Sequence, residues 1–280
     1  MSSSTFKLAM GQMLVEGDKV QANLSRAGKM IENAAEQGCS FIVLPECLDL
    51  GWANPAAREL ARPIPGPSSE ILCRSARESK IYVVAGLTEQ AEKRIYDSAL
   101  LISPDGRILL RYRKINLLTG VETMYSVGGS LAIATMTLGA IGVDICADNF
   151  PDSLTLGHAL ARMGAQILLS PCSWAVEAEH DNAKEPYGSL WKRSYTTLAK
   201  LYDMTVVGVS NVGWINAGAW KGRKCIGCSL AIGSQGQVLV QGPYGASAER
   251  LIVTTIELLP HEVVGTAIAD MLKGKGYSGP

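Results

Sequence analysis

The sequence carries no excess charge of either sign, because its 26 Lys and Arg residues balance its 26 Asp and Glu residues. A neutral chain gives no electrostatic reason to expect nucleic acid or an anionic membrane as a partner. No apolar run approaches the roughly 20 residues that a membrane-spanning helix needs. The first residues also lack the basic and apolar regions of a signal peptide. The seven cysteines are odd in number and scattered, so we expect a cytoplasmic protein without a disulfide framework.

Hydrophobic residues are plentiful, at 47% of the 280 residues, whereas charged residues make up 19%. This balance allows a large core and argues against disorder. Short apolar runs alternate with segments of helical spacing, which predicts an α/β protein. We expect helices at 20–37, 68–79, 156–163 and 189–202, and strands or strand pairs at 6–13, 41–44, 81–88, 96–102, 107–112, 131–138, 140–145, 167–172, 205–210 and 230–239.

The second half of the chain repeats the order of the first half. Gly38, a short apolar strand and Pro45 are matched 126 positions later by Gly164, a similar strand and Pro171. One such unit of strands and helices leaves a sheet face bare, and stacking two units buries both bare faces. We therefore expect a four-layer α-β-β-α sandwich with an internal pseudo-two-fold repeat, formed as a single domain by residues 1–260. Residues 261–280 are expected to form a tail that contacts another subunit.

Four reactive side chains stand in loops that follow predicted strands: Glu46, Lys114, Glu122 and Cys146. Ligands collect outside strand ends in open sheets, and a thiol at a strand-to-turn junction meets free backbone N–H groups that lower its pKa. Each residue alone has a plainer interpretation, since loop charges are commonly exposed and cysteine is among the most buried residue types. Glu46 is matched in the second half by Cys172 rather than by a carboxylate, which favours a role beyond folding.

The chain resembles the nitrilase superfamily of carbon–nitrogen hydrolases in three sequence blocks, which are Leu44-Pro45-Glu46, Tyr112-Arg113-Lys114-Ile115-Asn116-Leu117 and Ile141-Gly142-Val143-Asp144-Ile145-Cys146-Ala147-Asp148. The order and separation of the blocks fit, and Glu122 lies where amidase members of that family carry a second glutamate. The likeness runs from Phe6 to about Leu259 and includes the internal repeat. Three ordered blocks are a specific signal, whereas any one of them would be weak.

The resemblance implies a catalytic role for each of the four residues. Cys146 would attack the carbonyl carbon of an amide, and Glu46 would protonate the leaving amine and then activate the water that cleaves the thioester. Lys114, with the backbone N–H of Ala147, would stabilise the tetrahedral oxyanion. Glu122 would hold Lys114 or the amide nitrogen in position. The implied reaction releases ammonia and a carboxylic acid, and it needs neither a metal nor an organic cofactor.

Departures from the family pattern favour a small neutral or cationic amide as substrate. Ala147 stands where many nitrile-cleaving members have tryptophan, and Asn149 stands where several carboxylate-binding members have arginine. Arg58, Arg62 or Arg193 could bind a carboxylate instead. Hydrolysis of an N-carbamoyl amine or amino acid stays open, because the same four groups cleave both kinds of bond. A non-catalytic binding protein on the same fold is the alternative from another class, and the intact reactive positions count against it.

Other residue patterns carry less information about function. Trp174 follows a predicted strand and is expected to line the substrate pocket, together with Ala147 and Asn149. Cys225 and Cys228 have C-x-x-C spacing, but no second pair of zinc ligands is nearby, so we expect them to pack.

The sequence gives little support for a Cys–His catalytic pair or for a nucleotide site. A Cys–His pair would need a histidine near Cys146, and His158 on the following helix is expected to be a packing residue instead. No phosphate loop of the G-x-x-x-x-G-K-[ST] type occurs, which counts against a nucleotide site. The expected partners are a small-molecule amide and further copies of the chain, since members of the family usually assemble as dimers or higher homo-oligomers.

Overall fold

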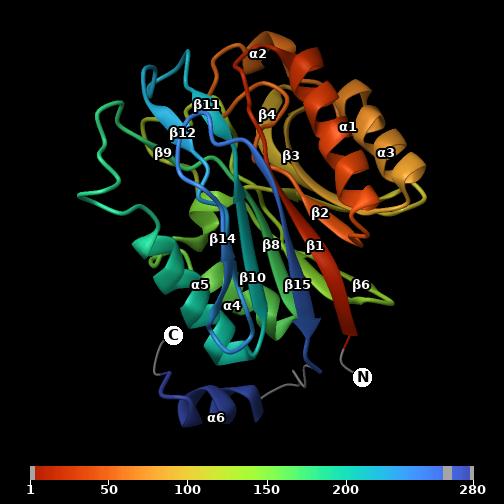
Figure 1. Cartoon of the computed structure of the whole chain (residues 1–280), viewed down its shortest axis with the longest axis vertical. Helices are drawn as coiled ribbons and strands as arrows, with labels where there is room; N and C mark the ends of the chain where they lie inside the picture. The colour runs from red at the N-terminus through yellow and green to blue at the C-terminus, as the bar shows by residue number, and fades with distance from the viewer. Residues whose placement is uncertain (1–3, 261–266, 278–280) are drawn as a thin grey trace.

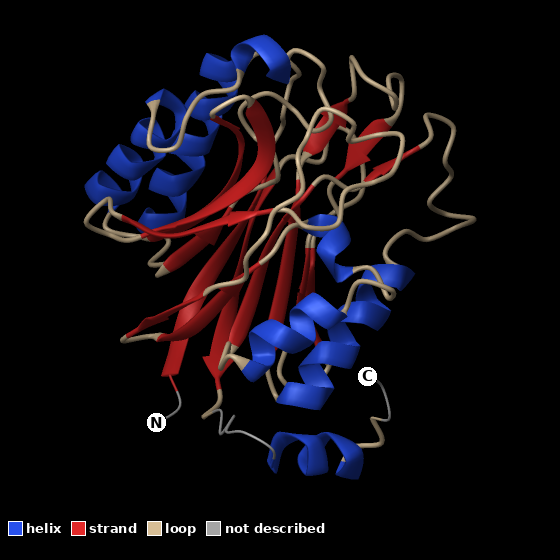
Figure 2. Cartoon of the chain, turned by 180° about the vertical axis from the view of Figure 1, so that it is seen from behind, coloured by secondary structure: helices blue, strands red, loops and turns tan. Residues whose placement is uncertain are grey.

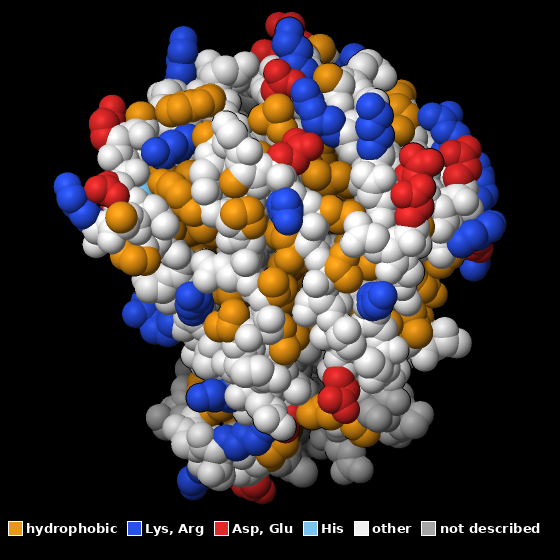
Figure 3. Space-filling view, in the orientation of Figure 1, with side chains coloured by type: hydrophobic (Ala, Val, Ile, Leu, Met, Phe, Trp, Pro, Cys, Tyr) orange, Lys and Arg blue, Asp and Glu red, His pale blue; other side chains and the backbone are white. Residues whose placement is uncertain are grey.

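The computed structural model describes residues 4–260 and 267–277. Two six-stranded sheets pack face to face in the middle, and helices cover the outer face of each sheet (Figure 1, Figure 2). This confirms the predicted four-layer α-β-β-α sandwich. Basic and acidic side chains are interspersed over the visible face, in keeping with the balanced composition (Figure 3). Among the described residues, no helix is both long enough and apolar enough to cross a membrane.

The first sheet comes from the first half of the chain and one late strand. Its side chains alternate between two faces, so that one face meets the second sheet and the other meets α1 (Val20–Glu36) and α3 (Pro67–Ser79). Ile42 packs toward these helices, whereas its neighbours Phe41 and Val43 pack toward the second sheet. In spatial order the strands are β15 (Arg250–Leu258), β1 (Ser4–Gln12), β2 (Phe41–Val43), β3 (Tyr82–Ala91), β4 (Arg94–Ile102) and β5 (Ile108–Arg113).

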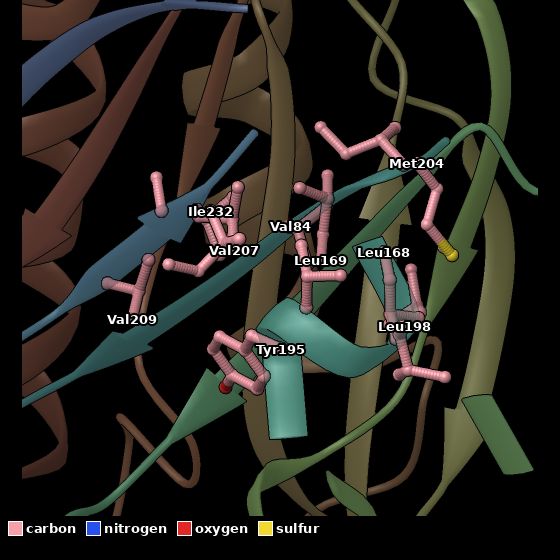
Figure 4. Packing of buried hydrophobic residues seen from close by; sticks show 14 of the residues in the cluster. Val84, Leu168, Leu169, Tyr195, Leu198, Met204, Val207, Val209 and Ile232 are labelled. Carbon is pink, nitrogen blue, oxygen red and sulfur yellow. The ribbon is translucent and has the colours of Figure 1, made fainter. Parts of the chain in front are cut away.

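The second sheet comes from the second half and packs against α4 (Thr155–Arg162) and α5 (Ser189–Tyr202). Val84 from the first sheet and Leu169 from the second belong to one buried cluster, which joins the two sheets (Figure 4). Tyr195 and Leu198 of α5 belong to the same cluster. In spatial order the strands are β14 (Val238–Gln241), β13 (Leu230–Ile232), β10 (Thr205–Ser210), β8 (Ile167–Cys172), β7 (Gly139–Val143) and β6 (Ile133–Met136).

The topology confirms the internal repeat. Strands β1, β2, β3, β4 and β5 of the first sheet have the same neighbours as β7, β8, β10, β13 and β14 of the second. Each sheet is completed by an antiparallel strand beside its first member, which is β15 next to β1 and β6 next to β7. The parallel strands of both halves therefore end in equivalent places, and the loops after them lie near the contact between the sheets.

Strand β15 and, in the tail, helix α6 (Ala267–Gly274) were not predicted from the sequence, and neither were three shorter features. A short helix, α2 (Ala57–Leu60), precedes α3, and a 3-10 turn, η1 (Cys146–Asn149), follows β7. A small third sheet consists of β11 (Val212–Trp214), β12 (Lys224–Ile226) and β9 (Ala175–Val176). These pieces are too short to show a clear periodicity in the sequence.

The described part of the C-terminal tail folds against its own chain. It contains α6 (Ala267–Gly274), whose Ile268 and Leu272 join the main buried cluster. Lys275 Nζ lies 2.8 Å from Asp203 Oδ2 at the end of α5. Residues 261–266 and 278–280 of the predicted tail lie outside the described residues. A subunit contact through the tail stays a prediction.

Candidate active site

The structure brings Glu46, Lys114, Glu122 and Cys146 together between the ends of the two sheets. Glu46 follows β2, Lys114 follows β5, and Cys146 opens the 3-10 turn after β7. These strands end at the same edge of the sandwich, where polar side chains from different parts of the chain can meet. Cys146 and Lys114 line one cavity, and Glu46 lies within hydrogen-bonding distance of Lys114.

Lys114 is the centre of a buried ionic cluster. Its Nζ donates to Glu46 Oε1 at 2.6 Å and to Glu122 Oε1 at 2.7 Å, and it lies 3.5 Å from Asp97 Oδ2. All four side chains are buried. Three carboxylates around one ammonium would be costly without such close pairing, because a buried charge loses its hydration. Oxygens of the three carboxylates also lie within 4.8 Å of one another, a spacing that could hold a metal ion, but the Lys114 ammonium contacts all three carboxylates.

Glu122 is held from two further directions. Trp52 Nε1 donates to Glu122 Oε1 at 2.7 Å, and the backbone N–H of Leu118 donates to Oε2 at 2.6 Å. In contrast, Glu46 Oε2 is buried without a hydrogen-bond partner among the described residues. Glu46 therefore has one oxygen on Lys114 and one oxygen that faces the neighbouring Asp97 carboxyl, whereas both oxygens of Glu122 are used.

The backbone of Cys146 is held in an unusual conformation. Its φ of 44° lies in the left-handed region, which is uncommon for a residue other than glycine and occurs often at functional sites. Its N–H donates to Ser170 Oγ at 3.1 Å, and Asn149 Nδ2 donates to the same oxygen at 3.2 Å. Asn149 Nδ2 also donates to Asp144 Oδ1 at 2.7 Å. This network fixes the turn that presents the thiol.

A second network joins the Lys114 segment to the Cys146 turn. Asp148 accepts hydrogen bonds from the Tyr112 hydroxyl at 2.7 Å, from the Asn116 backbone N–H at 2.8 Å and from the Ile145 backbone N–H at 3.1 Å. The Asn116 side chain adds a bond of 3.1 Å. One buried carboxylate therefore sets the position of two loops that come from different sheets.

The cavity above these groups has a volume of about 260 Å³. Its wall is mostly apolar and aromatic, with few charged side chains. The lining residues are Trp52, Lys114, Leu118, Cys146, Phe150, Ser173, Trp174, Ala175, His180, Glu185, Pro186, Tyr187, Gly188, Ser189, Leu190, Trp191 and Trp220. A pocket of this kind with a few convergent polar groups is typical of a small-molecule site.

Comparison with known proteins identifies the family. The sequence model of the carbon-nitrogen hydrolase family matches residues 7–259. The chain belongs to that family, within the nitrilase superfamily. It is 34% identical to an omega-amidase, NIT2-A of Xenopus laevis, over 59% of this chain and 63% of that protein. The match thus spans less than two thirds of that relative's length.

Other similar proteins match a larger share of this chain. A protein named nitrilase from Pyrococcus abyssi is 32% identical over 82% of this chain and 81% of that protein. The crystal structure of a carbon-nitrogen hydrolase from Helicobacter pylori superposes with a TM-score of 0.81 at 19% identity, covering 98% of this chain and 94% of the other. At that identity the superposition establishes the fold alone.

Burial and neighbouring charges shift the pKa values of Glu46 and Lys114. Burial raises the pKa of the Glu46 carboxyl well above its usual range, although Lys114 opposes the shift. Burial alone would lower the pKa of the Lys114 ammonium, but the attraction of Glu46, Glu122 and Asp97 outweighs it and raises that pKa well above its usual range. Lys114 therefore stays charged, and Glu46 is a stronger base than an exposed carboxylate.

The Cys146 thiol also has a raised pKa. The neighbouring Cys172 thiol contributes most, followed by burial and the nearby Glu46, whereas Lys114 opposes the shift. The resting group is thus a thiol, and attack on a carbonyl requires a base that accepts its proton. The sequence-based argument that the strand-to-turn junction lowers this pKa is not supported.

Not every residue expected to bind substrate reaches the cavity. Trp174 lines it, but Ala147 and Asn149 are buried beside it and are not among its lining residues. Asn149 uses its amide to hold Asp144 and Ser170, because the tight 3-10 turn directs this side chain back toward β8. Asn149 thus holds the Cys146 turn, and its contact with substrate stays a prediction.

The alternative carboxylate-binding residues also lie elsewhere. Arg58, Arg62 and Arg193 are exposed and do not line the cavity.

His158 bonds the Tyr202 hydroxyl through Nδ1 at 2.7 Å and packs against α5, in agreement with the predicted packing role. Cys225 and Cys228 are buried free thiols. Burial raises the pKa of Cys225 to about 12 and that of Cys228 to about 11.

Sequence reasoning missed several residues of the site. Asp97 sits within β4, and a charged residue inside an otherwise apolar strand was the signal that could have found it. His180 and Tyr187 line the cavity from the loop between β9 and α5, where no periodicity marks them. Their approach depends on the small third sheet and its loops, which the sequence did not predict.

Proposed function

We propose that the chain hydrolyses the carbon–nitrogen bond of a small amide through a thioester on Cys146. The observation that carries the proposal is the pairing of a cavity-facing thiol with the buried Lys114–Glu46–Glu122 cluster. The similarity to omega-amidases supports an amide as substrate. Cys146 supplies the nucleophile, Glu46 the base and Lys114 the positive charge, so the proposed reaction needs no cofactor.

In the first half-reaction, Cys146 Sγ attacks the amide carbonyl carbon. Glu46 accepts the thiol proton and passes it to the amide nitrogen, which leaves as ammonia. The raised pKa of Glu46 supports this role, since a carboxylate with a high pKa accepts a proton readily. The carbonyl oxygen becomes an anion in the tetrahedral intermediate, and the Lys114 ammonium and the Ala147 backbone N–H stabilise it.

In the second half-reaction, water cleaves the thioester. Glu46 takes a proton from the water and returns it to the Cys146 sulfur as the carboxylic acid leaves. Glu122 does not exchange protons in this scheme. Its two oxygens are held by Trp52, Leu118 and Lys114, which suits a group that positions the Lys114 ammonium.

The test is ammonia release from a panel of linear amides, combined with mass spectrometry of the protein. We expect turnover by the wild type, an acyl adduct on Cys146, and loss of both in Cys146→Ala. Cys73→Ala, which changes a partly exposed thiol on α3, serves as the matched control and should stay active. Equal inactivity of wild type and Cys146→Ala across the panel, with no adduct on the wild type, would refute the proposal.

We also propose that the protein works in the cytoplasm as a homodimer or a higher homo-oligomer. All seven cysteines are free, which suits a reducing compartment. Assembly is supported by the family resemblance, since members usually form oligomers. Light scattering on the purified protein would test the assembly, and a monomer at micromolar concentration would count against it.

A further inference from the structure

Much of the active-site cavity is walled by aromatic rings. Trp174 and Trp191 stack with ring centroids 4.9 Å apart, and Phe150 stacks on the same Trp191 ring at 5.2 Å. Tyr187 lies 6.2 Å from Trp174, so these rings form one continuous wall. All four residues line the cavity that contains Cys146 and Lys114. We call Phe150, Trp174, Tyr187 and Trp191 the aromatic wall.

Most polar atoms of the surrounding rings already bond to protein groups. Trp191 Nε1 donates to the Tyr187 hydroxyl at 2.9 Å, and Trp52 Nε1 donates to Glu122. Trp174 Nε1 and His180 Nε2 are the exceptions, since both are buried without a hydrogen-bond partner among the described residues. The wall therefore offers mainly carbon atoms to a ligand, and such an apolar surface favours another ring over a charged group.

Among the described residues that line the cavity, no lysine or arginine is free to bind a carboxylate, and His180 is the one histidine. Lys114 is the one Lys or Arg among its described lining residues, and its charge is engaged by Glu46 and Glu122. The N-terminus of α5, at Ser189, contributes a partial positive charge. Glu185, an exposed lining residue that precedes α5, carries the opposite charge on the same side of the cavity. The electrostatic surroundings thus disfavour an anionic substrate.

The size of the cavity suits a ring as well as the reacting group. An apolar protein cavity of about 150 Å³ can hold a benzene molecule. The present cavity, at about 260 Å³, leaves further room for an amide and a short connecting chain.

We propose that the amide substrate carries an apolar aromatic ring on its acyl group, which stacks against the aromatic wall, rather than a terminal carboxylate. This inference rests on the proposed amide hydrolysis and specifies its substrate class. It differs from what the resemblance alone implies, because the resemblance leaves the substrate's side group undefined.

The experiment compares 3-phenylpropionamide with succinamate, which place a phenyl ring and a carboxylate on the same two-carbon chain next to the amide. We expect kcat/KM to be at least about tenfold higher for 3-phenylpropionamide, because only the ring gains apolar contact with the wall. Propionamide, which lacks both groups, measures the basal reaction. A preference for succinamate, or equal kcat/KM for 3-phenylpropionamide and propionamide, would overturn the proposal.

Two variants test whether the aromatic wall causes the preference for 3-phenylpropionamide. Trp191→Leu removes the ring that both Phe150 and Trp174 stack on, and it should lower the ratio of kcat/KM for 3-phenylpropionamide over propionamide at least about fivefold. Trp214→Ala is the matched control, because Trp214 is 56% exposed and does not line the cavity. The ratio should not change in that variant. An unchanged ratio in Trp191→Leu would contradict the proposal.

A binding measurement separates failure of this proposal from failure of the proposed hydrolysis. Calorimetry on Cys146→Ala compares the same two amides without turnover. Binding of 3-phenylpropionamide at least about tenfold tighter than succinamate supports the ring-binding site even if no amide is hydrolysed. Tighter or equal binding of succinamate overturns it even if propionamide is hydrolysed normally.

Discussion

The loop after β2 and the loop after β8 occupy equivalent places in the two halves of the repeat but differ in chemistry. In the first, Pro45 is followed by Glu46, which pairs with Lys114. In the second, Pro171 is followed by Cys172, whose thiol lies 3.8 Å from the Tyr195 hydroxyl and within the core. The two loops touch, since the Glu46 N–H donates to Cys172 O at 3.3 Å.

This difference separates the scaffold from the chemistry. Both halves supply a strand, a proline and a buried loop at the contact between the sheets, which explains why the backbone is repeated. Only the first half supplies the proposed base Glu46 and the Lys114 ammonium, and only the second supplies the proposed nucleophile Cys146. Stacking two similar units therefore brings unlike groups together across a symmetric interface. Substitutions in one loop should affect turnover, whereas those in its counterpart should affect mainly packing.

The largest effect is expected from Glu46→Gln. The amide keeps the shape but cannot accept the thiol proton, so kcat/KM should fall by about a thousandfold. In the wild type, the raised pKa of Glu46 means that kcat/KM falls with decreasing pH through a value well above 4.5, because the base must be ionised. Steady-state kinetics between pH 4 and 9 measure both effects. Glu70→Gln, an exposed carboxylate on α3, should leave both unchanged.

Lys114→Met should reduce kcat/KM about a hundredfold or more through loss of the oxyanion partner. It should also destabilise the fold by about 3–5 kcal/mol, since Glu46, Glu122 and Asp97 lose their buried counter-charge. Folded-state carboxyls with raised pKa values bind protons more tightly than unfolded ones. Stability of the variant should therefore fall as pH rises from 5 to 8, as measured by urea unfolding. Lys29→Met on the exposed face of α1 is the control. Equal free energies of unfolding for the two variants would mean that Lys114 does not stabilise the buried carboxylates.

Gly86→Ala tests how closely the Glu46 loop lies against β3. A Cβ on Gly86 would stand 2.5 Å from Glu46 Cα and 2.8 Å from Pro45 O, both backbone atoms. Relief of the clash would move Glu46, and we expect a loss of about 1–3 kcal/mol in stability and of about tenfold to a hundredfold in kcat/KM. Gly129→Ala meets nothing within 4 Å and should be neutral in both measurements. Normal turnover in Gly86→Ala would mean that the loop tolerates displacement.

The same comparison explains what the sequence could and could not predict. The repeat predicted both loops and the four-layer fold, because strand length, glycine and proline are local signals. The position of Asn149 could not be predicted, since its hydrogen bonds to Asp144 and Ser170 depend on how η1 meets β8. The aromatic wall is likewise assembled from residues that follow η1 and β8, from the loop before α5 and from α5 itself. Side chains that meet only through tertiary packing leave no periodic signal in the sequence.

The smallest effect is expected from Cys172→Ala in the second loop. Cys172 does not line the cavity, so kcat/KM should change by less than about tenfold, in contrast to Cys146→Ala. The variant removes the neighbouring thiol that contributes most to the raised pKa of Cys146. Alkylation of Cys146 by iodoacetamide should then begin at a lower pH than in the wild type, because more thiolate is present at a given pH.

Cys225→Ala is the matched control for this last comparison, since Cys225 is another buried thiol and is not among the groups that shift the pKa of Cys146. The pH dependence of Cys146 alkylation should stay at its wild-type position in that variant. If Cys172→Ala were as inactive as Cys146→Ala while remaining folded, Cys172 would have to take part in the reaction. The division between a catalytic first loop and a packing second loop would then fail, and the repeat would supply reactive groups from both equivalent positions.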